Sequence, residues 1–448
     1  MARQMRLKTE RMSEEEPNLN GSDSPSTTPT KNSKSALVRE LGLGLITGAA
    51  DDDPSAIGTY ASAGAVFGPA FLWMAPVTVP MMFAAVYLSG KLGQVAGQGL
   101  FAVLRKHYPH WVVWPTLVAV AIGNIIEAGA DLGGIAAAIN LLIPVPVRAL
   151  VVAIAGVILA LQIWSSYALM RNLFRLLALA LLAYIPAAIF AKPDIPALIK
   201  GTLVPAIHFN KEFLSMLVAI VGTSLSAYLY TWQSNEEVEE EIQKGRVLLS
   251  QRRGATDVEL RQTRNDVWFG MIFSNLAMYF IMLATSATLF KAGNTDLNSA
   301  ADAAQALNPI AGNAAGTLFA LGVIGVGFLA VPVMTAGAAY DVCQTIGWNY
   351  GLNKRPMQAR KFYIAICIFT ALGVAINFLN FNPMKALVFA GIVQGFSTPP
   401  LMLLIMLMTN NPAIMGERVN GRAINILGGI TTAAVFAASV GLVLANLA

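Results

Sequence analysis

Long apolar segments separated by short polar stretches follow one another along the chain from residue 37 onward. Each holds roughly 17–25 residues, the length that an α-helix needs to cross a bilayer. We expect eleven such helices, near residues 43–67, 71–90, 112–143, 147–168, 173–191, 213–233, 267–290, 314–339, 362–380, 385–409 and 423–446. The pattern therefore predicts an all-α polytopic membrane protein.

Residues 1–36 differ from the rest of the chain. They are polar, rich in Ser, Glu, Lys and Pro, and contain no apolar core. A cleaved signal peptide would need an apolar stretch of about 7–15 residues. We therefore predict a disordered tail over residues 1–36 and a transmembrane domain over residues 37–448.

The composition supports a membrane protein. The chain is 56% hydrophobic and 12% charged, whereas a soluble domain carries about 25% charged residues. The two cysteines, Cys343 and Cys367, lack the spacing of a zinc site and give no sign of a disulfide framework.

The basic residues predict the orientation. Most of the 30 lysines and arginines fall in the N-terminal tail and in loops on one side of the predicted spans. By the positive-inside rule, this distribution predicts a cell (inner) membrane protein with a cytoplasmic N-terminus and an extracytoplasmic C-terminus. It also explains the net charge of +5 without nucleic acid, so the bilayer is the expected partner. The oligomeric state is not predicted.

Three consecutive aspartates, Asp51, Asp52 and Asp53, interrupt the first apolar segment. A carboxylate at membrane depth normally faces a cavity, a partner or an ion path. Pro54 removes a backbone donor directly after the triplet, which favours a broken helix at mid-membrane. We expect Asp53 to bind a cation beside the carbonyl of Ala50, with Asp51 or Asp52 partnered or solvated. In the alternative interpretation, a loop begins here and the carboxylates are hydrated.

A second break is predicted in the sixth segment, where Gly222 and four serine and threonine side chains lie within residues 222–231. Broken helices at matching positions of two halves indicate a midplane binding site. We therefore expect an inverted repeat of five plus five helices, with the first repeat over about residues 40–192, the second over about 212–409, and an extra helix at 423–446.

The third segment carries Asn124, Glu127 and Asp131, whose spacing places all three on one helical face. They are either a functional pathway or a structural network that bonds a neighbouring broken helix. Gln394 in the tenth segment either binds the ion or bonds another helix, the commoner role of a lone amide. The glutamates of residues 236–241 are expected to form a solvated helix end, and in the alternative they draw cations to the cytoplasmic mouth.

The chain contains no nucleophile elbow, phosphate-binding glycine loop or paired histidine ligands. We therefore expect no enzyme activity and no cofactor, and a metal ion only as transported substrate.

The motifs at the two breaks and in the third segment resemble those of the NRAMP divalent-metal transporters, more narrowly their magnesium-transporter branch. The matching residues are Asp53-Pro54-Ser55-Ala56, Gly222 to Tyr228, and Gly129 to Leu132. The resemblance covers nearly the whole chain after residue 37. It implies a leucine-transporter-type fold with alternating access, metal binding by Asp53, and backbone ligands at Ala50 and Thr223.

The sequence departs from the family pattern at the predicted ligands. Ser55 and Ala56 replace the usual Gly and Asn, and Ser226 stands at the position of the methionine ligand. A thioether favours softer transition metals, so its replacement leaves an oxygen-only site. Mg²⁺ keeps several of its waters, and a wider oxygen-lined pocket suits it. The departures favour Mg²⁺, unless side chains such as Gln394 restore a transition-metal site.

The resemblance also bears on proton coupling. The family's early span-three Glu corresponds to Asn124, its later span-three acid to Gly134, and its span-six His to Tyr228. A tyrosine hydroxyl stays protonated at neutral pH and is a poor proton carrier. We therefore expect uncoupled uptake, although Glu127 and Asp131 could still carry protons.

We thus expect a carrier that imports a divalent cation, with Mg²⁺ favoured. Its principal ligand would be Asp53, completed by Ala50, Thr223 and Ser226, with Tyr228, Gln394 and Glu127 around them. The alternatives are a proton-coupled Mn²⁺/Fe²⁺ symporter, a cation channel, and a carrier of organic cations or amino acids on the same fold.

Overall fold

The computed structural model describes residues 43–164, 184–295, 297, 300–304, 312, 315–379 and 381–447. The predicted tail at residues 1–36 lies outside the described residues, as does most of the predicted fifth span. Within the described ranges the secondary structure is helical, without strands.

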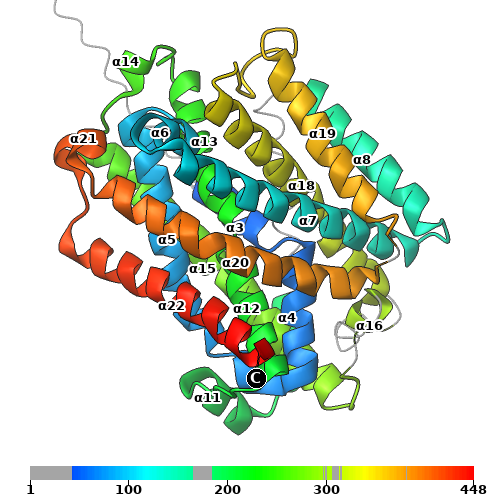
Figure 1. Cartoon of the computed structure of the whole chain (residues 1–448). Coiled ribbons are helices and arrows are strands. Elements are labelled where there is room, and N and C mark those ends of the chain that lie inside the picture. Colours follow the sequence, from blue (N-terminus) through cyan, green and yellow to red (C-terminus); the bar gives the residue numbers. More distant parts are fainter. Residues whose placement is uncertain are drawn as a thin grey trace, which may run out of the picture. The chain divides into compact units, whose positions relative to one another are not determined.

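The helices follow one another as shown in Figure 1. The first half comprises α3 (Leu43–Asp51), α4 (Pro54–Phe67), α5 (Met74–Ala96), α6 (Leu100–His107), α7 (His110–Asn140), α8 (Val147–Trp164), α10 (Tyr184–Phe190) and α11 (Ile195–Leu203). The second half comprises α12 (Lys211–Ser224), α13 (Ala227–Gln243), α14 (Leu249–Arg252), α15 (Asp257–Thr285), α16 (Ala300–Ala304), α18 (Ala315–Ile346), α19 (Arg360–Ile376), α20 (Pro383–Thr409), α21 (Pro412–Met415) and α22 (Arg422–Leu447).

Eight segments within the described residues are long and apolar enough to cross a membrane, with α12 and α13 counted together. The split pair α3–α4 and the 17-residue α19 are shorter and fall outside that count. Because most of the predicted fifth span is not described, the total of eleven spans stays a prediction, and so do the repeat boundaries.

The first predicted break lies between α3 and α4. Asp53 has extended backbone and caps α4, where its side chain accepts from the amide of Ala56. Pro54 occupies the first turn of α4, where its missing donor costs nothing. The sequence therefore ends one helix and begins another within two residues, as predicted.

The second predicted break lies at Leu225 and Ser226, between α12 and α13. The freed carbonyl of Leu225 accepts hydrogen bonds from Tyr230 Oη at 2.6 Å and Thr398 Oγ1 at 2.7 Å. Side-chain donors thus satisfy the backbone oxygen that the break sets free, as the interior of a membrane protein requires.

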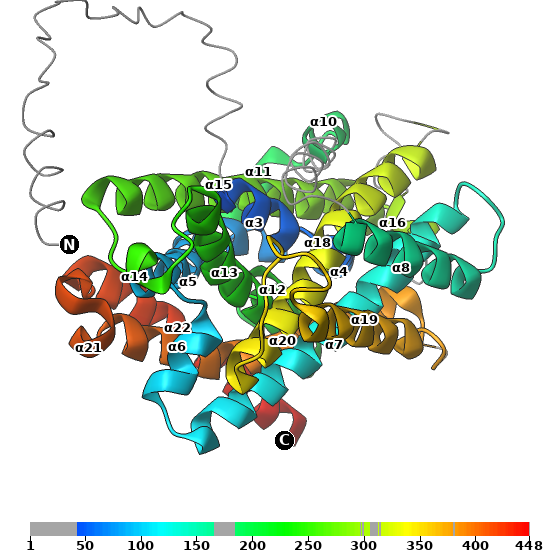
Figure 2. The same cartoon turned by 90° about the horizontal axis from the view of Figure 1, so that it is seen from above.

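The broken helices lie in the interior, as the view from above shows (Figure 2), whereas α8 and α22 lie at the periphery. Glycine permits the closest approaches. A Cβ at Gly48 of α3 would lie 2.2 Å from the carbonyl oxygen of Gly270 in α15, and one at Gly222 of α12 would lie 1.9 Å from that of Gly391 in α20. Backbones in contact hold both breaks in place.

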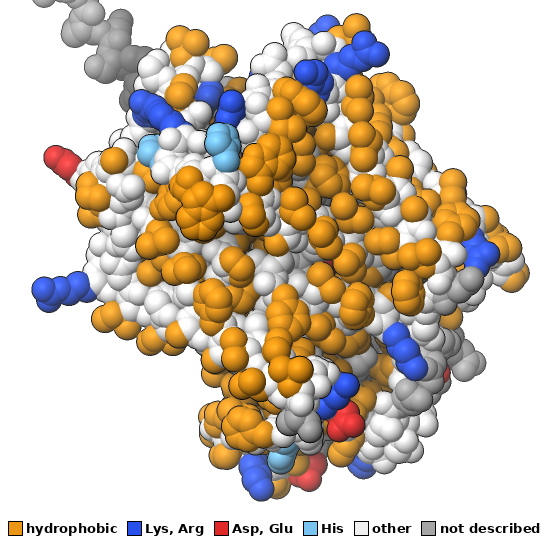
Figure 3. Space-filling model, viewed as in Figure 1, with side chains coloured by type: hydrophobic (Ala, Val, Ile, Leu, Met, Phe, Trp, Pro, Cys, Tyr) orange, Lys and Arg blue, Asp and Glu red, His pale blue; other side chains and the backbone are white. Residues whose placement is uncertain are grey.

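Hydrophobic side chains cover much of the face seen in Figure 3, and charged side chains gather toward its rim. Trp164, Leu203 and Ile426 are among the large apolar residues exposed on the surface. An apolar surface of this extent is that of a protein surrounded by lipid.

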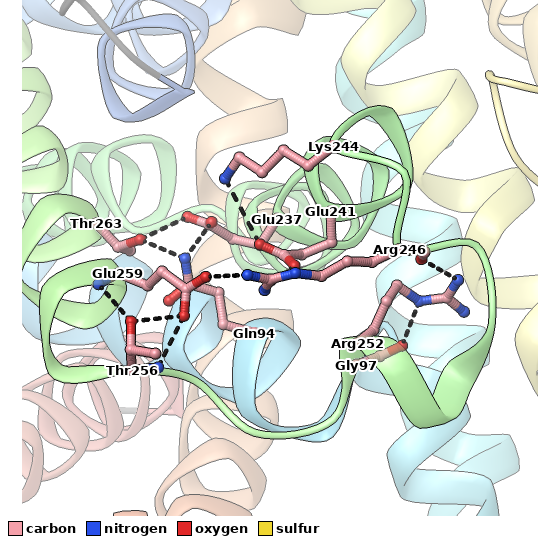
Figure 4. Close-up of polar contacts among 10 residues, drawn as sticks. All are labelled: Gln94, Gly97, Glu237, Glu241, Lys244, Arg246, Arg252, Thr256, Glu259 and Thr263. Carbon is pink, nitrogen blue, oxygen red and sulfur yellow. Dashed lines mark hydrogen bonds and ion pairs between the residues drawn. The ribbon is translucent and has the colours of Figure 1, made fainter. Parts of the chain in front are cut away.

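Four of the five glutamates at the end of α13, namely Glu236, Glu237, Glu239 and Glu241, are buried, so the prediction of a solvated helix end was wrong. Glu237 accepts from Gln94 of α5 and from Gln233, and Thr263 of α15 also donates to it (Figure 4). Glu241 pairs with Lys244 and Arg246, and Arg246 also reaches Glu259 at 2.7 Å.

Glu239 is buried as well and accepts from Tyr340 Oη of α18 at 2.5 Å. Such partners allow α13 to continue ten residues beyond the predicted end at residue 233. Buried carboxylates with several donors are stable only when those donors are in place. The network therefore fastens α13 to α5, α15 and α18.

Candidate metal centre

The candidate site lies where the two helix breaks meet. Asp53 and Ala50 come from the α3–α4 break, and Thr223 and Ser226 come from the α12–α13 break. None of the four has exposed surface. The site is therefore closed to solvent in this conformation.

The two carboxylate oxygens of Asp53 face different elements. Oδ1 accepts from the Ala56 amide and from Ser55 Oγ, each at 2.7 Å. Oδ2 accepts from Tyr228 Oη at 3.1 Å. The cap of α4 thus fixes one oxygen, and the other points toward α13.

Ser55 connects three helices at this centre. Its hydroxyl lies 2.7 Å from Asp53 Oδ1, 3.2 Å from Glu127 Oε1 and 3.3 Å from Thr223 Oγ1. Its backbone amide donates to Asp131 Oδ1 at 2.9 Å. The Ser55 hydroxyl has one proton, so it can donate to only one of these oxygens at a time.

Glu127 of α7 is the second acid at the centre. Its Oε2 accepts from Gln394 Nε2 of α20 at 2.6 Å, and its Oε1 accepts from Ser226 Oγ at 3.3 Å. Gln394 Nε2 also lies 3.4 Å from Asn124 Oδ1. Gln394 therefore makes the interhelical hydrogen bond expected of a lone amide. Asn124, Glu127 and Asp131 are all buried on the inner face of α7.

Hydroxyl groups hydrogen-bond both carbonyls that the sequence indicated as ligands. Tyr228 Oη donates to the Ala50 oxygen at 2.7 Å. Ser226 Oγ lies 3.0 Å from the Thr223 oxygen and 2.8 Å from the Gly222 oxygen. A cation at these carbonyls would replace the two hydroxyl donors.

The other two aspartates of the triplet are fully buried, so the interpretation of a hydrated loop was wrong. Asp51 Oδ2 accepts from Ser274 Oγ of α15 at 2.6 Å. Asp52 is also buried and lies beside the same serine, Ser274. Asp51 therefore has a hydrogen-bond partner, which was one of the two expected outcomes, and neither Asp51 nor Asp52 is solvated.

The centre holds acids without a basic partner. None of the ion pairs found in the described ranges involves Asp51, Asp52, Asp53, Glu127 or Asp131. Burying several carboxylates in apolar surroundings is costly unless protons or a cation neutralise them. The arrangement therefore attracts positive charge.

A small apolar cavity adjoins the site beside Pro54. It is lined by Ile57, Gly58, Gly134, Ala137, Phe319, Val323, Pro383, Met384 and Leu387. With no polar side chain in its lining, the cavity offers a cation no ligand.

The sequence did not single out Ser55 as a ligand-bearing residue, although the structure places it at the centre of the contacts. Its position directly after Asp-Pro in a helix break was the available signal. Ser274 was also missed, because one serine in a long apolar helix carries no pattern.

Two discontinuous helices that meet at a buried, oxygen-rich and acidic centre define a secondary transporter of the leucine-transporter type. A family model described as natural resistance-associated macrophage protein-like (Nramp) matches residues 44–445. The chain belongs to the NRAMP family.

Relatives agree with this assignment. The divalent metal cation transporter MntH of Klebsiella pneumoniae (strain 342) is 26% identical over 430 residues, 93% of this chain and 98% of that protein. MntH of Bacillus subtilis (strain 168) is 26% identical over 422 residues, covering 91% and 92%. These relatives are named as transporters, in agreement with the expectation that the chain is not an enzyme and that metal is cargo.

Solved structures share the fold. The Eremococcus coleocola manganese transporter, crystallised with an aromatic bis-isothiourea substituted compound, has a TM-score of 0.66 at 16% identity, covering 96% of this chain and 90% of that one. Mhp1, a nucleobase-cation-symport-1 family transporter in a closed conformation, has a TM-score of 0.56 at 11% identity, covering 91% and 92%. These likenesses establish the fold, as predicted.

Proposed function

We propose that this protein imports a divalent metal cation by alternating access, with Mg²⁺ as the favoured substrate and without proton coupling. Asp53 is the principal ligand. The carbonyls of Ala50 and Thr223, with Ser226, complete the site directly or through waters. The observation that carries the proposal is a buried acidic centre at two helix breaks that offers oxygen donors and no basic partner.

The donor atoms support Mg²⁺. The atoms gathered around Asp53 and Glu127 are carboxylate, hydroxyl, carbonyl and amide groups, supplied by Ser55, Thr223 and Gln394 among others. Oxygen ligands suit hard cations, whereas sulfur favours softer transition metals. Ser226 supplies an oxygen where the NRAMP pattern has a thioether.

Packing at Gly134 supports uncoupled transport. A Cβ at this position would lie 3.2 Å from Pro54 Cβ and 3.3 Å from a methyl of Leu387. The environment is apolar and the contacts are tight, so the position suits a small residue better than the acid of the family pattern. The membrane potential alone can drive entry, since 100 mV, negative inside, favours a divalent ion by about 4.6 kcal/mol.

The direction of transport follows from the proposed orientation, with the N-terminus in the cytoplasm and the C-terminus outside the cell. The uneven distribution of Lys and Arg supports it. We further propose that residues 40–192 and 212–409 form the two inverted repeats, because each begins with a broken helix.

A proton-coupled Mn²⁺ symporter is the second candidate. Two observations favour it. First, Glu127 and Asp131 are buried acids, and Ser55 forms hydrogen bonds with both of them and with Asp53. Second, the relatives include proteins named as divalent metal cation and manganese transporters.

Uptake into proteoliposomes separates the two candidates. Mg²⁺ and Mn²⁺ uptake would be measured with a pH dye in the lumen, for the wild type and Asp53→Ala. We expect Mg²⁺ uptake that Asp53→Ala abolishes, without movement of protons. Mn²⁺ uptake that acidifies the lumen, with no Mg²⁺ signal, would reverse the choice of both ion and coupling.

A further inference from the structure

A pocket that shares no residue with the candidate metal centre lies between α6 and the end of α18. It has a volume of about 400 Å³. Its lining includes Gln98, Arg105, Lys106, Gln344, Trp348 and Tyr350. None of the described residues that line it is acidic, so the pocket presents positive charge to whatever enters it.

The walls of this pocket are held together by contacts between helices. Gln344 of α18 accepts from the amide of Ala102 in α6 at 3.1 Å, and its Nε2 donates to Asn235 Oδ1 of α13 at 2.5 Å. Arg105 lies against Gly347, where a Cβ would come within 2.1 Å of Arg105 Nη1. Gly347 also has a φ of 89°, which glycine adopts without strain. The packing of three helices therefore builds the pocket and places the guanidinium at its edge.

The cations around the pocket are available to a ligand. Arg105 and Lys106 are exposed, and neither takes part in an ion pair found in the described part of the chain. Lys361 adds a third cation, with its Nζ 4.6 Å from the centre of the Trp348 ring. A smaller neighbouring pocket shares Lys106 and adds Arg253. Cations grouped around a concave surface attract an anion.

An apolar surface begins beside the same pocket, at the start of α7. Its residues Trp111, Trp114 and Val118 are 76%, 44% and 51% exposed. Their spacing places them on one helical face, and exposed tryptophans are typical of the membrane–water interface. Lys and Arg side chains gather at the end of the molecule where α6 lies, next to this hydrophobic face (Figure 1 and Figure 3). A ligand with an anionic head and an apolar tail would meet both surfaces.

We propose that the pocket binds the phosphate headgroup of an anionic phospholipid, with the acyl chains along α7. Basic pockets between helices at the cytoplasmic membrane surface suit such headgroups. The proposed orientation places α6 and the end of α18 on that side, since the N-terminus is assigned to the cytoplasm. The inference does not depend on which ion the protein transports.

Native mass spectrometry of the full chain in detergent tests the site. Phosphatidylglycerol is the anionic probe, and phosphatidylcholine, which has a phosphate but no net charge, is the neutral one. We expect the wild type to bind phosphatidylglycerol in preference. Arg105→Gln combined with Lys106→Gln should weaken this binding about thirtyfold, equivalent to roughly 2 kcal/mol for two charges. Affinity within twofold of the wild type would overturn the proposal.

Arg261→Gln combined with Arg264→Gln is the matched control. Both arginines are exposed on α15, on the same predicted side of the membrane, and they line neither pocket. This variant loses the same charge and should bind phosphatidylglycerol within twofold of the wild type. Equal weakening in the two double variants would show a diffuse attraction to basic surface and would contradict a defined site.

Lys361→Gln provides an independent test, because it leaves α6 unchanged. We expect phosphatidylglycerol binding to weaken about fivefold, equivalent to roughly 1 kcal/mol. Thermal unfolding with inorganic phosphate separates a lipid from a soluble anion. If inorganic phosphate raises the unfolding temperature of the wild type and phosphatidylglycerol does not bind, the assignment to a lipid is wrong. Equal binding of the two lipids by the wild type would overturn it as well.

Discussion

The phenolic oxygen of Tyr228 lies 2.7 Å from the carbonyl oxygen of Ala50. The first turn of α13 is thereby bonded to the end of α3, across the two helix breaks. The same hydroxyl lies 3.1 Å from Asp53 Oδ2. Tyr228 therefore bonds two groups to which we assign the cation, and its hydroxyl competes with the ion for both.

Tyr228→Phe should bind Mg²⁺ more tightly than the wild type. Without the hydroxyl, the ion no longer displaces a hydrogen bond, which contributes about 1 kcal/mol and corresponds to roughly a fivefold change in affinity. Titration calorimetry with Mg²⁺ in detergent measures this. A weaker affinity would show that the hydroxyl assists the ion instead of competing with it.

Glu127→Gln should weaken Mg²⁺ binding about tenfold, a loss of roughly 1.4 kcal/mol. The variant keeps the size of the side chain and its contacts with Ser55, Ser226 and Gln394 but removes one negative charge beside Asp53. Calorimetry and Mg²⁺ uptake both report the change. If affinity stays the same while the thermal unfolding temperature falls, Glu127 serves only the packing of α7 and α20.

Ser226→Cys should shift the selectivity of the site. The two side chains are similar in size, but a thiolate or thiol sulfur is a softer ligand than a hydroxyl. We expect Cd²⁺ to compete with Mg²⁺ about tenfold better in this variant, a gain of roughly 1.4 kcal/mol. Ser226→Ala is the control and should show no such gain. Equal Cd²⁺ competition in both variants would place Ser226 outside the ligand set.

Gly222→Ala should destabilise the protein by about 1–3 kcal/mol, because overpacking forces backbones apart. The new Cβ would lie 1.9 Å from the Gly391 carbonyl oxygen, at the contact of α12 with α20. Gly441 of α22 has no heavy atom within 4 Å of such a Cβ and provides the matched control. Thermal unfolding in detergent compares the two alanine variants, and equal stability would contradict the close approach.

The sequence allowed both helix breaks to be predicted, because proline, glycine and hydroxyl residues are rare in lipid-facing helices. Asp53-Pro54 marked the first break directly. The second was located to within a few residues of Leu225 by the hydroxyls around it. Family motifs then connected the breaks to a fold that hydropathy alone could not specify.

The contacts at the centre could not be predicted, since they depend on how helices far apart in sequence pack. Ser55 meets Glu127 and Thr223 only after α4, α7 and α12 come together. The prediction of a solvated end for α13 was wrong for a related reason, because the partners of its buried glutamates lie on helices distant in sequence. A run of acids usually indicates solvent, and only the donors on α5, α15 and α18 make its burial possible.

Titration of Mg²⁺ into the purified wild type and Asp53→Asn tests the central claim most directly. The variant keeps a side chain of the same size at the break but removes the negative charge to which we assign ion binding. We expect saturable Mg²⁺ binding to the wild type and none to Asp53→Asn, with both proteins folded. Equal binding by the two proteins would contradict a metal centre at Asp53.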